Sequence, residues 1–283
     1  MKIIHYLTIL RPVNAAMAAG AVWLGAWISS SPLSTWAITL LGTVAFISTG
    51  FGNVINDILD RHTDRICHPG RPLPSGRMSI RNAYGYLVIL GVAALFTAFR
   101  IAPLYGYATA IPLVVLVLYA LFLKGTPLAG NLLVSLLVAY SLVFGSLNAP
   151  GFHRLVLPAL LAMLLNLSRE IVKDIEDKPG DTAAGIATTA ILPQKLLKVI
   201  LLACSVLYGM MVLLPFFLGH FGFAYVIVVA AAPLPLHIYR LRLLLKSAWT
   251  VHCGTMSLLL KIEMLFGLAA LAADRLTTIL SAG

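Results

Sequence analysis

The sequence has little charge and very little acid. Charged residues make up 11% of its 283 residues and hydrophobic residues 60%, whereas about a quarter of a typical soluble domain is charged. Only 10 residues are Asp or Glu, against 20 Lys and Arg, so the formal net charge is +10. This composition excludes an ordinary soluble globular protein and predicts a multi-pass helical membrane protein.

Cysteine is also scarce, and its positions exclude two further classes. Cys67, Cys204 and Cys253 lack the paired spacing of a zinc site or a disulfide framework. The basic excess needs no nucleic-acid partner, because Lys and Arg collect in the cytoplasmic loops of membrane proteins. Arg11-Pro12 interrupts the first apolar run, so we expect a retained span there and no cleaved signal peptide.

Apolar runs long enough to cross a bilayer occur along the whole chain. A spanning helix needs about 20 such residues. The runs predict spans at 10–29, 35–59, 80–99, 102–123, 127–148, 153–175, 195–218, 221–241 and 254–278. We therefore predict a single all-α transmembrane domain over residues 1–283 with nine transmembrane helices.

The positions of Lys and Arg predict how the protein is oriented. If the N-terminus is cytoplasmic, only Arg100, Arg154 and Arg275 fall in outside loops, and Lys261 lies within the last span. All other basic residues then fall inside, as the positive-inside rule expects. We predict a cell-membrane protein with a cytoplasmic N-terminus and functional cytoplasmic loops at about 60–79, 123–127 and 176–194.

The few acids are gathered in two short windows with one spacing. The first window contains Asp57, Asp60 and Asp64; the second contains Asp174, Asp177 and Asp181, with Glu170 and Glu176 beside them. The windows end the second and sixth predicted spans, so both reach the same membrane face. This predicts two four-helix pseudo-repeats plus one helix around a central cavity. The remaining acids are Glu263 and Asp274; Glu263 lies inside the last predicted span, where a charge is a functional candidate by default.

Carboxylates in this pattern predict a site for a hard metal ion. On a helix the three acids of a window fall within an arc of about 60° and repel one another. Magnesium offsets such repulsion, since it binds a few carboxylates together with substrate phosphates. Pro179-Gly180 is expected to unwind the last turn of the second window. The alternative is a solvated loop whose acids pair with neighbouring Arg and Lys side chains.

Two basic residues near the windows are candidate phosphate ligands. Arg71 lies in a turn-rich basic loop after the first window, where a guanidinium can bind phosphate oxygens in pairs. Lys124 is the single charged residue between Arg100 and Arg154, and it falls on the predicted face of both windows. The alternatives are an ordinary positive-inside loop for Arg71 and an interfacial anchor for Lys124.

Together these motifs resemble the UbiA superfamily of membrane prenyltransferases. Asn56-Asp57-x-x-Asp60-x-x-x-Asp64 resembles the first signature of that family, and Asp177-x-x-x-Asp181 resembles the second. Arg71-Pro72-Leu73-Pro74-Ser75-Gly76 is similar to the loop after the first signature, Arg11-Pro12-x-Asn14 to the opening motif, and Tyr119 with Lys124 to the Tyr/Lys motif. The resemblance covers nearly the whole chain.

The resemblance implies transfer of a prenyl group from its diphosphate with two magnesium ions. It implies metal ligands at Asn56, Asp60, Asp64, Asp177 and Asp181; diphosphate or acceptor contacts at Arg11, Asn14, Arg65, Arg71, Lys124, Arg169 and Lys173; and catalytic roles for Asp57, Asp174, Tyr119 and Lys124. The prenyl tail would lie in the apolar helix bundle, with the active site facing the cytoplasm.

The acceptor is a narrower question, and the second window bears on it. The segment from Arg169 to Asp181 is similar to the branch of the family that makes archaeal-type ether lipids. That similarity implies transfer of geranylgeranyl from its diphosphate to geranylgeranylglyceryl phosphate. A quinone-precursor, chlorophyll or haem prenyltransferase is the alternative within the family. Outside it, an ion-coupled transporter or a magnesium channel would also use intramembrane acids, although transport carboxylates usually lie near the bilayer midplane.

Overall fold

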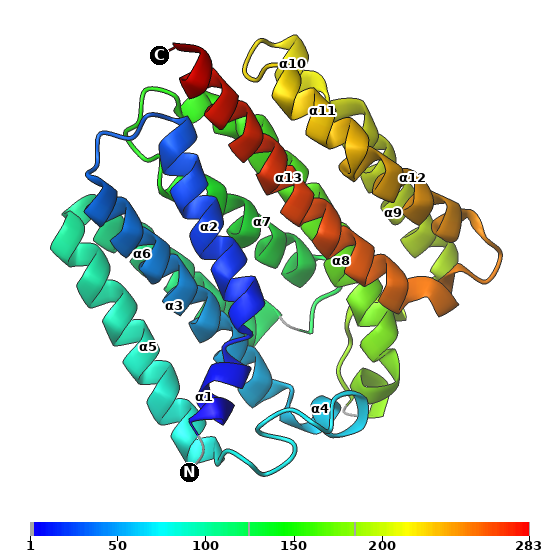
Figure 1. The fold of residues 1–283 in the computed structure, drawn as a ribbon. Coiled ribbons are helices and arrows are strands. Elements are labelled where there is room, and N and C mark those ends of the chain that lie inside the picture. Colours follow the sequence, from blue (N-terminus) through cyan, green and yellow to red (C-terminus); the bar gives the residue numbers. More distant parts are fainter. Residues whose placement is uncertain (1–2, 124, 184, 283) are drawn as a thin grey trace. The chain divides into compact units, whose positions relative to one another are not determined.

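The computed structural model describes residues 3–123, 125–183 and 185–282, and within them every regular element is a helix (Figure 1). The chain forms two compact units. Unit 1 comprises Met1–Trp23, Leu33–Thr126 and Asp177–Thr188, and unit 2 comprises Leu24–Pro32, Pro127–Glu176 and Thr189–Gly283. Both acidic windows except Asp174 and the glutamates therefore belong to unit 1.

Unit 1 is built on a group of long apolar helices. Its helices are α1 (Ile4–Ile9), most of α2 (Pro12–Ile28), α3 (Thr35–Leu59), α4 (Arg61–Cys67), α5 (Ile80–Ile101), α6 (Pro103–Leu118), a π-helix (Tyr119–Leu123) and the end of α8. α3 packs against α5, which packs against α6 (Figure 1). Serine N-caps start two of these helices: Ser34 accepts from the Ala37 N–H and Ser79 from the Asn82 N–H, both at 3.2 Å.

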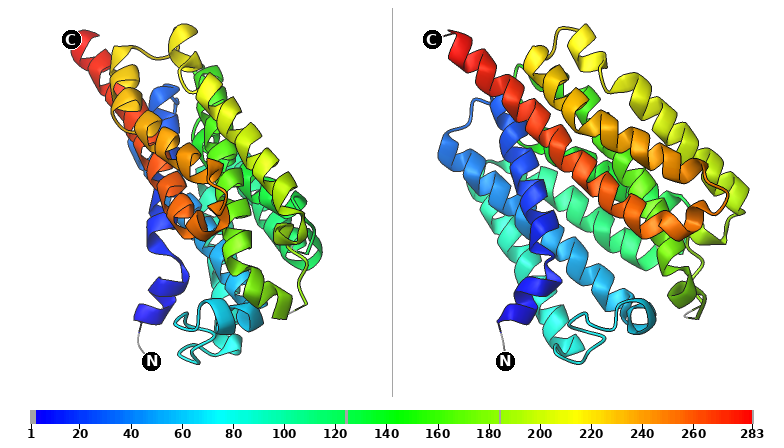
Figure 2. Two further views of the ribbon diagram at one scale, coloured as in Figure 1. Left: turned by 90° about the vertical axis from the view of Figure 1, so that its right-hand side faces the viewer. Right: turned by 45° about the vertical axis from the view of Figure 1, so that its right-hand side comes forward.

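Unit 2 contains the C-terminal helices. They are α7 (Ala129–Phe144), α8 (Val156–Ala183, up to Glu176), α9 (Gln194–Met211), α10 (Leu214–Phe217), α11 (Phe223–Ala231), α12 (Pro233–Leu245) and α13 (Cys253–Ala282), with short 3₁₀ turns at Phe152–Leu155, Thr189–Ile191 and Trp249–His252. α13 packs against α11 and α12 (Figure 2). The span predicted at 221–241 corresponds to one candidate span, Phe223–Leu245. Within it Pro233 ends α11 and starts α12, because a proline nitrogen cannot donate the next helical hydrogen bond.

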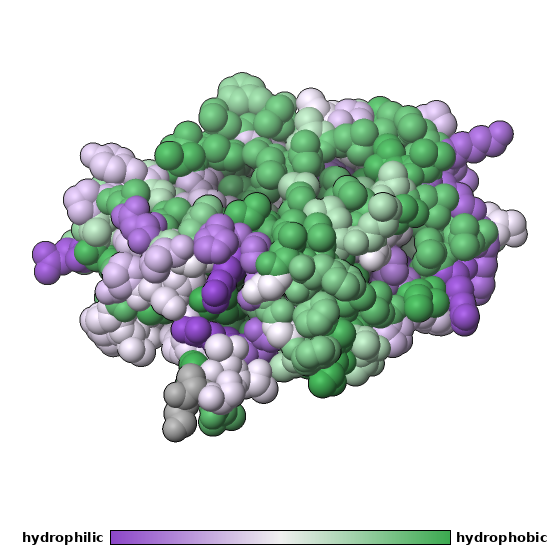
Figure 3. All heavy atoms as spheres, turned by 90° about the horizontal axis from the view of Figure 1, so that it is seen from above, coloured by the Kyte–Doolittle hydropathy of each residue, from purple (hydrophilic) through white to green (hydrophobic). Residues whose placement is uncertain are grey.

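Within the residues that the structure describes, seven helical segments have the length and composition to cross a membrane. α2 and α7 are apolar but shorter, at 17 and 16 residues, which corresponds to about 25 Å of helix against a hydrocarbon core of about 30 Å. Large side chains such as Phe96 and Phe223 are 67% and 75% exposed, and hydrophobic residues cover much of the face drawn in Figure 3. The chain is a multi-pass membrane protein, while the ninefold crossing, the cytoplasmic N-terminus and the single domain stay predictions.

The second acidic window differs from the sequence prediction in its local structure. Pro179-Gly180 was expected to unwind the helix there, but α8 continues through Pro179 to Ala183. Contacts from α4 hold this last turn. A Cβ atom added at Gly180 would lie 2.6 Å from the Cys67 sulfur and 2.9 Å from the Thr63 carbonyl oxygen. The missing side chain thus lets the end of α8 lie directly on α4.

Candidate active site

The first acidic window lies at a break between two helices of unit 1. α3 ends at Leu59, Asp60 follows as its C-cap, and α4 starts at Arg61. Asp57 and Asp64 are 1% and 2% exposed, and Asp60 is half-buried. A buried carboxylate needs a charged or hydrogen-bonding partner to remain ionised, so the neighbouring basic residues are the next feature to consider.

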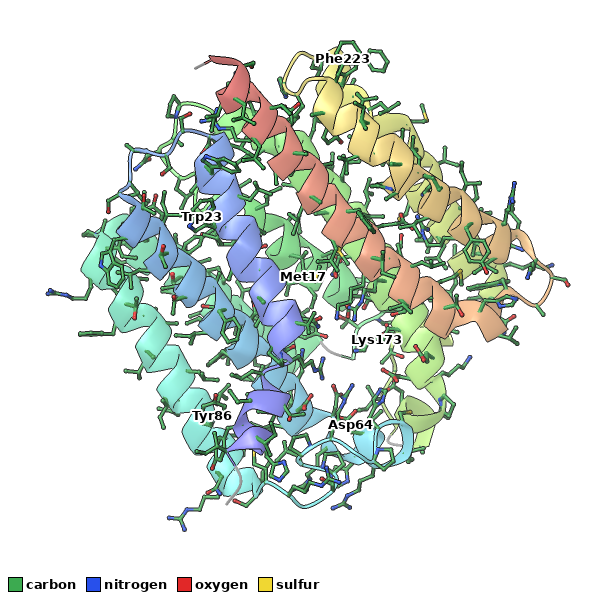
Figure 4. All side chains as sticks on the ribbon, viewed as in Figure 1. Met17, Trp23, Asp64, Tyr86, Lys173 and Phe223 are labelled. Atoms are coloured by element: carbon green, nitrogen blue, oxygen red, sulfur yellow. The ribbon has the colours of Figure 1, made fainter. Side chains whose placement is uncertain are left out.

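Arg71 is the partner of Asp64, which is labelled in Figure 4. The Arg71 Nη1 group donates to both carboxylate oxygens of Asp64 at 2.6 Å and lies 3.7 Å from Asp57 Oδ1. The loop is held in place locally, because the Arg71 N–H donates to the His68 carbonyl at 3.0 Å and Ser75 Oγ donates to the Arg71 carbonyl at 2.6 Å. The basic loop is therefore folded back onto the first window.

Arg11 reaches the same window from the break between α1 and α2. Its Nη2 group donates to Asp57 Oδ1 at 2.5 Å. The Arg11 backbone has φ of 51°, in the left-handed region that residues other than glycine rarely adopt. Asn53 of α3 fixes this break by donating from Nδ2 to the Leu10 carbonyl at 2.8 Å. The opening motif of the sequence thus packs against the first signature.

Burial and charge act in opposite directions on this pair. Burial raises the pKa of Asp64, repulsion from Asp60 and Asp57 raises it further, and the hydrogen bond and charge of Arg71 lower it, with a net increase. Burial alone would lower the pKa of Arg71, but Asp64, Asp57 and Asp177 leave it raised. The acids therefore keep Arg71 protonated. Arg71 only partly offsets the effect of burial on Asp64, so a further cation nearby would stabilise the Asp64 carboxylate.

The second window contributes Asp177 and Asp181 to unit 1. His68 Nε2 lies 3.0 Å from Asp177 Oδ1, and Thr188 Oγ1 donates to Asp181 Oδ2 at 3.0 Å. The Cys67 thiol donates to the Asp177 carbonyl at 3.5 Å. Burial raises the pKa of this thiol, and the charges of Asp177, Asp181 and Asp64 raise it further. Carboxylates from both windows are therefore close enough to act on one side chain.

The donor set suits magnesium. The five predicted ligands, Asn56, Asp60, Asp64, Asp177 and Asp181, all present oxygen, which hard divalent cations prefer. Among the described residues, no three His, Cys, Asp or Glu side chains converge tightly enough to hold a metal by themselves. Arg71 and His68 engage Asp64 and Asp177 instead. Magnesium commonly takes only one or two carboxylates and completes its shell with water and substrate phosphates, so the residues present fit an ion bound together with a diphosphate.

The other predicted residues of unit 1 are spread along its helices. Asn14 is half-buried at the start of α2, and Arg65 is exposed on α4. Tyr119 is half-buried and begins the π-helix, a geometry that occurs frequently at functional sites. Lys124 lies outside the described residues.

Three predicted residues lie on α8 within unit 2. Asp174 Oδ2 accepts hydrogen bonds from Asn131 Nδ2 at 2.9 Å and from the Thr189 N–H at 3.3 Å. Arg169 Nη1 donates to Glu170 Oε1 at 2.7 Å. Lys173, labelled in Figure 4, is half-buried. Arg169 thus neutralises a neighbouring carboxylate, and Asp174 is oriented by two protein donors.

Sequence reasoning missed several residues that orient the acids. His68 has no role among the predicted site residues, but its ring contacts Asp177. Thr188 and Asn131 were not singled out, although they hold Asp181 and Asp174. One signal was available for His68, because it lies only four residues after Asp64, the last acid of the first window. Thr188 and Asn131 have no comparable signal in a single sequence.

Comparison with known proteins identifies the family to which this chain belongs. Residues 15–259 match the UbiA prenyltransferase family. The digeranylgeranylglyceryl phosphate synthase of Methanopyrus kandleri is 35% identical over 281 residues, which cover 96% of this chain and 99% of that protein. A solved structure described as giving insight into digeranylgeranylglyceryl phosphate synthase in membranes is 31% identical, with a TM-score of 0.77 over 97% of this chain and 99% of that one.

A second solved structure shares the fold at lower identity. It is a UbiA homologue from Archaeoglobus fulgidus bound to DMAPP and Mg²⁺, 19% identical, with a TM-score of 0.64 over 94% of this chain and 99% of that chain. The family match spans most of the sequence, including both acidic windows and the loop that holds Arg71. This chain therefore belongs to the UbiA prenyltransferase family.

Proposed function

We propose that this protein transfers a geranylgeranyl group from geranylgeranyl diphosphate to geranylgeranylglyceryl phosphate, with two magnesium ions, at the cytoplasmic face of the cell membrane. The observation that carries the proposal is the gathering of Asp57, Asp64, Asp177 and Arg71 in unit 1. A site of this kind suits a polyanionic substrate bridged by metal. The names of the M. kandleri relative and of the similar structure support the choice of acceptor.

The protein residues have separable roles in this proposal. Asn56, Asp60, Asp64, Asp177 and Asp181 would hold magnesium, which would neutralise the diphosphate and make it a better leaving group. Arg71 would bind diphosphate oxygens directly. Among the described residues, Arg71 donates to protein acceptors only through Nη1. Its Nε and Nη2 groups can therefore contact phosphate while Nη1 still positions Asp64.

The reaction exchanges one C–O bond for another. The allylic C1–O bond of the donor breaks and the electron pair leaves with the diphosphate, where Arg71, Lys124 and Arg65 would stabilise the developing charge. The acceptor hydroxyl oxygen then bonds to C1, and its proton passes to the released diphosphate. Arg11, Asn14 and Tyr119 would border the donor, while the apolar helices shield the allylic cation from water.

Asp57 and Asp174 would orient the site. Asp57 is bound by Arg11 and Asp174 by Asn131 and the Thr189 N–H. We propose that these contacts hold the end of α3 and the last turns of α8 in place, and so position the neighbouring acids of each window. Arg169 and Lys173 would supply positive charge for the acceptor phosphate. Lys261 is close enough to Arg169 for their charges to repel each other, and an anionic acceptor would relieve that repulsion.

The test is prenyl transfer by the purified protein. Labelled geranylgeranyl diphosphate, magnesium and a panel of acceptors are supplied in detergent or liposomes, and the lipid products are separated. We expect a product with geranylgeranylglyceryl phosphate and release of diphosphate. A product with aromatic acceptors alone would replace the ether-lipid assignment by a quinone-type one. Movement of substrate into liposomes with no product from any acceptor would refute the enzymatic proposal and favour transport.

A further inference from the structure

A polar cavity lies in unit 2 among residues that the proposed reaction does not use. Its volume is about 240 Å³. Arg154 lines it from the turn before α8, His220, Phe221 and Gly222 from the turn before α11, and Asp274 and Arg275 from the last turns of α13. Side chains far apart in the sequence therefore converge on one small volume.

The cavity lies at the opposite end of unit 2 from the acidic residues of α8. Arg154 lies two residues before the start of this helix, and Asp174 follows 20 residues after Arg154. This separation corresponds to a rise of about 30 Å, close to the thickness of a bilayer core. α13 has the reverse direction. A Cβ atom at Gly254 near its start would lie 3.1 Å from Glu176, while Asp274 and Arg275 lie near its end. The cavity is thus at the other membrane interface.

Positive charge is concentrated here on a face that otherwise has little. Of the three Lys or Arg residues predicted for this face, Arg100, Arg154 and Arg275, two line the cavity. The one acid in the lining, Asp274, already accepts a hydrogen bond from the Gly222 N–H at 2.6 Å. Its negative charge is directed to the start of α11, where the helix dipole is positive. Two arginines face one carboxylate in this lining, so the cavity carries a net positive charge.

Two nitrogen atoms of the lining residues also lack partners. Arg275 Nη2 donates to Ser30 Oγ at 3.2 Å, but Arg275 Nε and His220 Nδ1 are buried with no hydrogen-bond partner among the described residues. Burial lowers the pKa of His220, and the charges of His153 and Arg154 lower it further. A buried donor left unsatisfied is unfavourable, more so in a charged group. Together these features make the cavity a site of positive electrostatic potential that is suited to an anion.

We propose that this cavity binds the phosphate group of an anionic membrane lipid. Arg154 and Arg275 would hold the phosphate between them, as guanidinium groups do in other phosphate sites. A lipid suits the surroundings better than a free ion, because exposed apolar side chains flank the turn beside His220. Phe217, Leu218 and Phe223 are 74%, 55% and 75% exposed, and acyl chains would cover them.

Thermal unfolding of delipidated protein in a neutral detergent tests this site. Wild type, Arg154→Gln and Arg275→Gln are titrated with dioctanoyl phosphatidylglycerol, dioctanoyl phosphatidylcholine or inorganic phosphate. Arg100→Gln is the matched control, because Arg100 is an exposed arginine outside the cavity. We expect phosphatidylglycerol to raise the unfolding temperature of wild type and of the control. Both cavity variants should need about tenfold more lipid, since one charge-assisted hydrogen bond is lost.

The titrations with inorganic phosphate and phosphatidylcholine distinguish a lipid phosphate from a free phosphate ion. Equal protection by inorganic phosphate, lost in both cavity variants, would keep the phosphate site but assign it to a free anion. Equal protection by phosphatidylcholine, or identical titrations for wild type and both variants, would overturn the proposal. Arg154 is exposed, so Arg154→Gln should fold even where Arg275→Gln does not. Native mass spectrometry of that variant should then show a lower fraction of bound phosphatidylglycerol, with prenyl transfer unchanged.

Discussion

Arg240 of α12 forms a fully buried ion pair with Glu263 of α13. The Arg240 Nε group donates to Glu263 Oε1 at 2.8 Å, and the two residues are 2% and 0% exposed. Ser205 of α9 accepts from Arg240 Nη1 at 2.9 Å, and His237 Nδ1 lies 2.8 Å from Nη2. The acid that the sequence left isolated in the last span is thus part of a network that joins three helices of unit 2.

Breaking this ion pair on one side should destabilise the protein. In Arg240→Met the Glu263 carboxylate keeps its burial and loses its partner, which typically costs about 3–5 kcal/mol. Arg240→Met/Glu263→Leu should be less affected than the single variant, because no unpaired charge remains. Denaturation in detergent measures both. Arg242→Met is the control, since Arg242 is exposed on the same helix; equal losses in Arg240→Met and Arg242→Met would contradict the prediction.

Replacing Arg71 should impair the chemical step more than folding. Arg71→Lys cannot reproduce the paired contact with Asp64 and phosphate, so we expect kcat for prenyl transfer to fall on the order of 100-fold, comparable to removing one donor from a charge-stabilising site. Steady-state kinetics with labelled prenyl diphosphate provides the measurement. Arg77→Lys, in an exposed part of the same loop, should match wild type, and an Arg71→Lys enzyme with unaltered kcat would remove Arg71 from the mechanism.

Removing a predicted metal ligand should weaken magnesium binding. Asp60→Asn and Asp177→Asn each lose a carboxylate, so both should need more magnesium for half-maximal activity, and a chelator should abolish activity in wild type. Magnesium with a prenyl diphosphate should also raise the unfolding temperature of wild type more than that of either variant. Glu176→Gln, an exposed acid beside the second window, is the control. Magnesium titrations that coincide for Asp60→Asn and wild type would exclude Asp60 as a ligand.

Adding one methyl group at Gly180 should separate the two acidic windows. In Gly180→Ala the new Cβ would meet the Cys67 sulfur and the Thr63 carbonyl oxygen, so the end of α8 has to move away from α4. We expect lower activity and a lower unfolding temperature. Cys67→Ala in the same chain should restore only part of the loss, because the Thr63 oxygen is backbone. Gly70→Ala, where a Cβ would meet nothing within 4 Å, should behave as wild type.

The sequence predicted the helices well where one apolar run corresponds to one helix. The span at 35–59 coincides with α3 (Thr35–Leu59), since a polar cap precedes it and acids follow it. Helix boundaries were predicted less well near proline. Pro233 separates α11 from α12, whereas Pro179 lies within α8 without ending it. The same residue type gives opposite results because tertiary contacts, here at Gly180, decide whether a helix continues.

The acids of the candidate site can be recognised in the sequence, and the residues that contact them only in part. Charge spacing alone identifies Asp57, Asp64 and Asp177. The pairing of Arg71 with Asp64 joins residues that are close in the sequence, so it could be anticipated. The contact of Arg11 with Asp57 depends on a left-handed backbone at Arg11, which no sequence pattern predicts. A contact such as that of Thr188 with Asp181 can be predicted only when the course of the loop after α8 is known, and a single sequence does not specify that course.

The left-handed backbone at Arg11 lowers the stability of the fold, so selection for thermal stability alone would favour its replacement. A left-handed backbone at a residue with a side chain typically costs about 1–3 kcal/mol, and Arg11→Gly would remove that strain. The same change would delete the ion pair with Asp57 beside the first window. A variant of this protein selected for thermal stability alone would therefore lose turnover through a residue outside the two acidic windows.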